Sequence, residues 1–134
     1  KIKSFILLLT TLTILFITAC SGTSEEDIAG TWKPVETNIV ADTITADKDQ
    51  IIAMERLEKS VYFVLNEDMS MKAVTSGMSI KGTWSFDKEK GHIYVLFEGS
   101  GSQEPSYLGE YSHGKLIKYH ETKDLKITTT YDKE

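Results

Sequence analysis

From Gly30 to the end of the chain, apolar and polar residues alternate with a period of two, and turn residues break the alternation at short intervals. This pattern is typical of β-strands that bury one face. Because most links between the runs are short, the strands should pair antiparallel in sequence order, as a meander. The pattern predicts eight strands, at residues 31–40, 60–66, 69–76, 79–87, 92–98, 106–112, 115–121 and 124–131.

One segment, residues 47–59, departs from this alternation and predicts a short helix after the first strand. Asp47 followed three residues later by Gln50 is typical of a capping box, and Glu55 and Lys59 have the i,i+4 spacing of a favourable ion pair. An apolar stripe should bury this helix against the sheet. The stripe consists of Ile51, Met54 and Leu57.

An eight-stranded meander twists enough to close on itself, and closure removes the exposed strand edges that favour aggregation. We therefore expect a mainly β fold over residues 30–134, an antiparallel barrel with one short helix after the first strand. The competing architecture is a flat or half-open sheet with the helix packed on one face. The choice depends on whether the first and last strands pair.

The first residues have a different character. After two lysines, residues 4–18 are almost free of charge and have the length of a signal-peptide core, shorter than the roughly 20 residues that cross a bilayer. Residues 17–20 (ITAC) resemble the lipobox of bacterial lipoproteins, which implies that Cys20 receives a diacylglycerol and becomes the new N-terminus. We expect residues 1–19 to be a lipoprotein signal peptide. An uncleaved anchor helix is the alternative.

Residues 21–29 are small and polar and then acidic, a composition that buries too little apolar area to order itself. Together with Cys20 they predict a lipidated, flexible acidic tether over residues 20–29. The triplet 25–27 (EED) also resembles surface-export signals of lipoproteins from Bacteroidota-type bacteria; a merely soluble linker is the other interpretation. We expect a lipid anchor in the bacterial cell envelope, at the outer membrane and facing either the periplasm or the outside.

Two short motifs carry a resemblance to a known family. Gly30 and Trp32 form a G-x-W pattern at the first strand, and Gly82 and Trp84 repeat it near the fourth. With the lipobox, the chain resembles small lipocalin-like lipoproteins of Bacteroidota-type bacteria. The resemblance implies an eight-stranded barrel with Trp32 packed across its closed end. The only arginine, Arg56, lies on the predicted helix, so the strand arginine that lipocalins stack on this tryptophan has no counterpart.

Strand alternation also predicts which side chains face the barrel interior. The inward set is Phe63, Leu65, Met71, Ala73, Trp84, Phe86, Ile93, Val95, Phe97, Tyr107, Tyr111, Tyr119 and Ile127. Many of these are aromatic, which suits a pocket with apolar walls and a few polar points. The candidate ligand-binding residues are Phe63, Met71, Trp84, Phe97, Tyr107, Tyr111 and Tyr119. A barrel of eight strands is just wide enough to hold one small ligand or to be filled by its own side chains.

Composition and charge exclude several classes of function. The 134 residues are 40% hydrophobic and 26% charged, as in an ordinary globular protein of one domain. Loss of residues 1–19 removes two lysines and no acid, so the net charge changes from −5 to −7, and no basic stripe remains to bind nucleic acid. The three histidines lack metal-site spacing, and the chain carries no catalytic motif that we recognise. We expect no enzyme activity, no metal and no cofactor.

The function that we expect is binding of a small apolar or amphipathic ligand by the envelope-anchored barrel, with the acylated Cys20 as the membrane contact. In the alternative, the barrel is solid and the protein is an interaction or inhibitor module without a small-molecule ligand. Its negative charge would steer a cationic protein partner, whose identity the sequence does not give, and salt would weaken the attraction.

Overall fold

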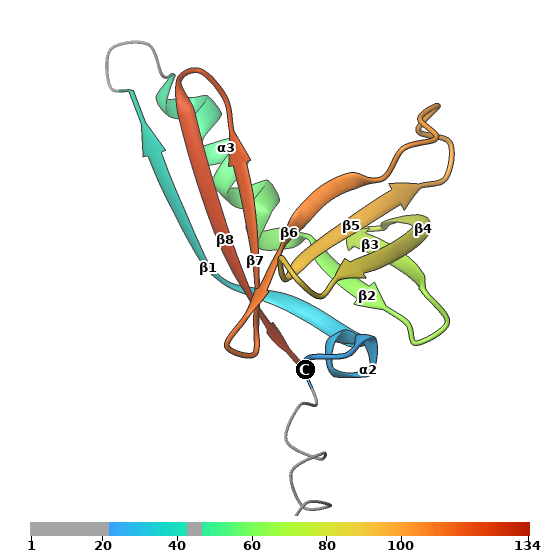
Figure 1. Cartoon of the computed structure of the whole chain (residues 1–134). Helices are drawn as coiled ribbons and strands as arrows, with labels where there is room; N and C mark the ends of the chain where they lie inside the picture. Colours follow the sequence, from blue (N-terminus) through green and yellow to red (C-terminus); the bar gives the residue numbers. More distant parts are fainter. Residues whose placement is uncertain (1–21, 43–46) are drawn as a thin grey trace, which may run out of the picture.

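The computed structural model describes residues 22–42 and 47–134 (Figure 1). Their order confirms the predicted series of eight strands and the helix after the first. The strands are β1 (Gly30–Ala41), β2 (Tyr62–Leu65), β3 (Ser70–Thr75), β4 (Met78–Asp87), β5 (His92–Phe97), β6 (Ser106–Ser112), β7 (Lys115–Glu121) and β8 (Leu125–Lys133). The helices are α2 (Glu25–Ile28) and α3 (Lys48–Ser60). The predicted signal peptide and Cys20 lie outside the described residues.

The barrel is closed, as predicted. Every strand pairs antiparallel with the next one along the chain, and β1 pairs with β8. This closing register runs from Trp32 opposite Lys133 to Ala41 opposite Leu125, with an irregularity at residues 34–36. The irregularity falls at Pro34, because a proline has no N–H to give to the ladder.

The closure is tight at one end only. β1 pairs with β2 only over residues 30–32, and β6 pairs with β7 only over residues 110–112. Beyond these short ladders the wall divides into two parts, β7–β8–β1 and β2 to β6, which diverge from each other (Figure 1). We call the tightly paired end, where α2 also lies, the base of the barrel. Helix α3 packs against β1, in the first of the two parts.

Helix α3 begins where the sequence predicts. The Asp47 side chain caps it by accepting a hydrogen bond from the backbone N–H of Asp49 at 3.0 Å, and no such bond to Gln50 completes a capping box. Lys59 and Glu55 form the predicted pair at 2.6 Å. The predicted apolar stripe is wrong at one position. Leu57 is exposed, and the next residue, Glu58, faces the barrel.

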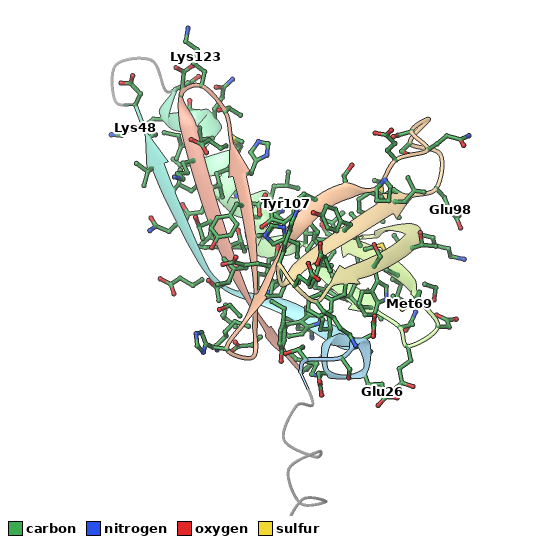
Figure 2. All side chains as sticks on the ribbon, in the orientation of Figure 1. Glu26, Lys48, Met69, Glu98, Tyr107 and Lys123 are labelled. Carbon is green, nitrogen blue, oxygen red and sulfur yellow. The ribbon has the colours of Figure 1, made fainter. Side chains whose placement is uncertain are left out.

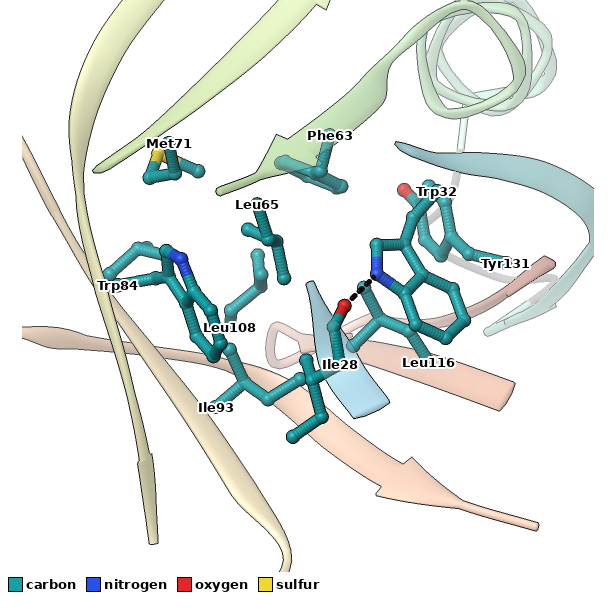
Figure 3. Close-up of a cluster of buried hydrophobic side chains, with 11 residues drawn as sticks. Ile28, Trp32, Phe63, Leu65, Met71, Trp84, Ile93, Leu108, Leu116 and Tyr131 are labelled. Atoms are coloured by element: carbon teal, nitrogen blue, oxygen red, sulfur yellow. Dashed lines mark hydrogen bonds between the residues drawn. The ribbon is translucent and has the colours of Figure 1, made fainter. Parts of the chain in front are cut away.

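A cluster of buried side chains fills the base (Figure 3). Its members from α2, β1 and β2 include Ile28, Trp32, Phe63 and Leu65, each 3% exposed or less. The Trp32 indole N–H donates to the backbone carbonyl of Ile28 at 2.8 Å, which fixes α2 across the end of the barrel. Trp32 therefore occupies the position that the resemblance to lipocalins implies.

The predicted tether is too long at its C-terminal end. Residues 25–28 form helix α2, and Ile28 is fully buried instead of belonging to a flexible link. Asp27 reaches back to the backbone N–H of Ser24 at 2.9 Å, and hydrogen bonds from Ser24 hold the pKa of this carboxyl below its usual range. The acidic composition predicted a solvated, flexible segment. Burial of Ile28 and the hydrogen bond between Asp27 and Ser24 order it as one helical turn.

The glycines of the two G-x-W motifs are needed for different structural reasons. Gly30 has a φ of +149°, a conformation that residues with a Cβ rarely adopt. Gly82 has no such angle, but a Cβ there would collide with the backbone carbonyl of Leu96 on the neighbouring strand. Backbone geometry therefore explains both glycines, at Gly30 through its φ angle and at Gly82 through the close approach of β5.

Candidate functional site

Five of the seven predicted ligand-binding residues lie at the barrel base. Phe63, Met71 and Trp84 are each 3% exposed or less, and Phe97 and Tyr111 are partly buried against them. The Trp84 indole N–H donates to the backbone carbonyl of residue 66 at 2.9 Å, which ties the β2–β3 turn to β4. These side chains form one packed core.

Of the other members of the predicted inward set, Leu65, Ile93, Val95 and Ile127 are buried, and Ala73 and Phe86 are partly buried against the core.

The other two candidates, Tyr107 and Tyr119, face outward and are 43% and 41% exposed, so their predicted inward orientation is wrong. In β6 the cause is a bulge opposite Ile93 and Tyr94, which inserts one extra residue. Leu108 then points into the core at 7% exposure. The alternation is shifted on one side of this bulge, so Tyr107 and Tyr111 lie on opposite faces.

In β7 the alternation is regular, but a charged residue occupies an inward position. Leu116 is fully buried, so Lys118 shares its face and Tyr119 lies on the other. Because Lys118 is charged, the inward face of β7 has the polar character that is typical of an outward face. The alternation in the sequence therefore predicted the wrong face of β7 to point inward.

Lys118 belongs to an inner polar cluster, which also contains Glu58 of α3 and Thr129 of β8. The Lys118 Nζ lies 2.8 Å from Glu58 Oε2 and 3.0 Å from Oε1, and Thr129 Oγ1 donates to Oε2 at 2.9 Å. The two charged side chains are only 19% and 14% exposed. The inner polar cluster thus connects α3 to β7 and β8 through bonds to one carboxylate.

Tyr131 lies beside this cluster with its ring 5.3 Å from that of Phe63. It is fully buried, and its hydroxyl has no hydrogen-bond partner within the described part of the chain. Desolvation, with a smaller contribution from the charge of Glu58, raises the pKa of Tyr131 well above its usual value. Sequence reasoning missed Glu58 and Lys118. The available signal was the spacing of Glu58, seven residues after Ile51 and therefore on the same, partly buried face of the helix.

Aromatic side chains gather on the outside of β5, β6 and β7. We call His92, Tyr94, Tyr107, Glu110 and Tyr119 the outer aromatic face. Figure 2 labels Tyr107 on β6. Its ring centroid lies 4.9 Å from that of His92 and 5.9 Å from that of Tyr94. The Tyr119 hydroxyl donates to Glu110 Oε1 at 3.0 Å. Partial burial and the Glu110 carboxylate raise the pKa of both Tyr107 and Tyr119.

A pocket of about 230 Å³ lies between the start of α3 and the end of the β7–β8 hairpin. We call it the α3 pocket. Its apolar contributions come from both elements, and several polar groups surround them. The lining residues are Asp47, Gln50, Ile51, Met54, Thr122, Asp124 and Leu125.

Residues 22–42 and 47–134 lack two kinds of feature. No group of three or more histidine, cysteine, aspartate or glutamate side chains is placed to hold a metal ion. No helix in the same ranges has the length and apolarity needed to span a membrane.

The comparisons with known proteins agree with this architecture. A family model described as a C-terminal lipocalin-like domain matches residues 16–132. The chain belongs to this lipocalin-like family. The lipocalin-like character expected from the two G-x-W motifs is therefore confirmed.

Among solved structures, this lipocalin-like chain is similar to a DUF4847 family protein from Bacteroides vulgatus. The two are 16% identical, with a TM-score of 0.47, and the match covers 79% of this chain and 94% of the other. A search of curated proteins found no match.

Proposed function

We propose that this lipocalin-like chain is a lipid-anchored, non-enzymatic binding protein of the bacterial cell envelope, whose solid barrel presents its outer surface to a protein partner. The filled base carries the proposal. Trp32, Phe63, Met71 and Trp84 occupy the space that an internal ligand would need, and Ile28 packs across the end. A barrel of eight strands is wide enough either for its own side chains or for one small ligand, and here side chains fill the base.

Position along the chain supports the proposed anchor. The described residues begin at Gly22, next to α2 at the barrel base (Figure 1). Acylation of Cys20 would hold the base toward a membrane, and the end with α3 would face away. Two or three acyl chains, at about 0.8 kcal/mol for each buried CH₂, are enough for stable attachment. We place the anchor in the outer membrane, because the acidic triplet 25–27 resembles surface-export signals of lipoproteins from Bacteroidota-type bacteria.

The inner polar cluster is the group of side chains that most resembles a reactive centre, and its hydrogen bonds support a non-enzymatic role. In the inner polar cluster, Lys118 and Thr129 both bond to the Glu58 carboxylate. Such a carboxylate is held in place by its neighbours, whereas a catalytic base needs an oxygen directed at the proton of a substrate. The cluster therefore serves to fix α3.

A second candidate function, binding of a small amphipathic ligand, is favoured by the α3 pocket. Ile51, Met54 and Leu125 give it an apolar wall, and Asp47 and Gln50 add polar groups. Its volume of about 230 Å³ is below the ~300–1,000 Å³ of common ligand sites, so the ligand would be smaller than a drug-sized molecule. This ligand would sit under α3 and not among the residues of the core.

Metabolic labelling tests the anchor. The full chain, with an initiator methionine, is expressed in a bacterial host supplied with an alkyne fatty acid. We expect label on the wild type and on Thr23→Ser, a conservative change three residues away, and none on Cys20→Ser. Equal label on Cys20→Ser would refute acylation at this cysteine.

A further inference from the structure

The outer aromatic face has a geometry that its role in the fold does not explain. The rings of His92, Tyr94 and Tyr107 are inclined to one another by 57–60°, with centroids 4.9–6.3 Å apart. Tyr107 is 43% exposed, so this tyrosine contributes little to the core and leaves much of its ring in solvent. Tyr119, on the same face, is 41% exposed, and exposed apolar surface that is gathered in one place is a feature of binding sites.

Strand register brings negative charge to the same face. In β5, His92 lies opposite Asp87 of β4 on one side and opposite Glu110 of β6 on the other. Residues paired in this way share a face of the sheet, so two carboxylates flank the imidazole. Lys115, on the outer side of β7, already forms an ion pair with Asp132.

The Glu110 carboxylate has capacity for a further donor. Tyr119 donates to its Oε1 atom, and Oε2 has no hydrogen bond within the described part of the chain. Desolvation and, after it, the Glu110 carboxylate raise the pKa of Tyr107 and of Tyr119, so this carboxylate acts on both hydroxyls. The face therefore combines electron-rich ring surfaces with an acceptor for N–H groups.

We propose that the outer aromatic face binds an arginine side chain of a protein partner, with the guanidinium over the Tyr94 and Tyr107 rings and hydrogen-bonded to Glu110. Tyrosine rings attract cations through their quadrupole, and arginine does so more often than lysine. A guanidinium also stacks on a ring while its N–H groups pair with a carboxylate. The chain as a whole carries a net charge of −5, which favours a basic partner.

This inference rests on the proposed function, since it names the chemistry of the partner of a solid barrel. A ligand inside the barrel would contradict the proposed function without affecting the face. If the outer aromatic face did not bind arginine, this inference would be wrong, and the proposed function would still hold with a partner bound elsewhere on the surface. The two proposals are therefore separated by different measurements.

The test uses the full chain in a non-ionic detergent and three synthetic peptides of equal length, each alternating glycine with arginine, lysine or citrulline. Citrulline keeps the shape of arginine and removes the charge. Isothermal titration calorimetry at 20 mM and 300 mM NaCl measures the binding. We expect the arginine peptide to bind most tightly, more weakly at high salt, and the citrulline peptide not to bind.

Three variants locate the binding. Tyr107→Ala and Glu110→Gln should each weaken binding of the arginine peptide by about tenfold. Glu67→Gln removes the same charge from the β2–β3 turn and should leave binding unchanged. Thermal unfolding of each variant checks that the fold is retained, which the exposure of Tyr107 favours.

Three results would overturn the inference. They are equal losses for Glu67→Gln and Glu110→Gln, equal binding of the citrulline and arginine peptides, and no binding of the arginine peptide at 20 mM NaCl.

Discussion

The ion pair between Glu58 and Lys118 should be a main determinant of how α3 is held. Lys118→Met keeps most of the side-chain length and removes the positive charge. The Glu58 carboxylate then stays 14% exposed with one remaining donor, the hydroxyl of Thr129 at 2.9 Å. A carboxylate with a single donor in such surroundings is poorly solvated, so the folded state loses stability.

The size of the effect follows from the burial of the pair. Removing one member of a buried ion pair costs about 3–5 kcal/mol, and the residual exposure of both side chains points to the lower end, about 3 kcal/mol. With an m-value of about 2 kcal/mol/M, the urea midpoint should fall by about 1.5 M. The fluorescence of Trp32 and Trp84, both buried at the barrel base, reports the transition.

Helix α3 itself supplies the matched control. Lys59 pairs with Glu55 at 2.6 Å, but these side chains are 58% and 41% exposed, so Lys59→Met should cost about 0.5 kcal/mol or less. The double variant Glu58→Leu with Lys118→Met removes both charges and should recover most of the loss. Equal midpoints for Lys118→Met and Lys59→Met would refute the reasoning.

Two further predictions concern the barrel base and its buried tyrosine. Ile28→Ala should lower the free energy of unfolding by about 2–4 kcal/mol, because Ile28 is fully buried. The control Gly22→Ala adds a Cβ that meets no neighbour and should change this free energy little. Urea titration compares the two variants. Tyr131 has a raised pKa in the folded state, so the wild type should lose stability as pH rises above about 10, the pKa of an unfolded tyrosine. Tyr131→Phe should lose less between pH 8 and pH 11 in the same titration, and an identical loss in both proteins would contradict this assignment.

The sequence predicted the strands well because turn residues mark each boundary. Asn66, Gly77, Gly91 and Gly114 all fall between strands, and the antiparallel meander follows from short links. The helix was equally legible from its Asp47 cap. Closure of the barrel was expected from the cost of open edges, and the long β1–β8 ladder confirms it.

The candidate site was less predictable, because single residues changed which face the side chains occupy. The bulge at Leu108 adds one residue to β6, and nothing in the local alternation marks it. Lys118 and Glu58 are charged residues that satisfy each other inside the fold, so each alone resembles a surface residue. Ile28 shows the opposite case, an apolar residue in a polar segment that is drawn into the core.

Native mass spectrometry of the full chain, purified from bacterial membranes in detergent, tests the central claim most directly. The account predicts a polypeptide that starts at Cys20, carries covalent acyl mass on that residue and has no additional small molecule bound. A small molecule that travels with the folded protein and is lost on denaturation would contradict a function that rests on a protein partner alone.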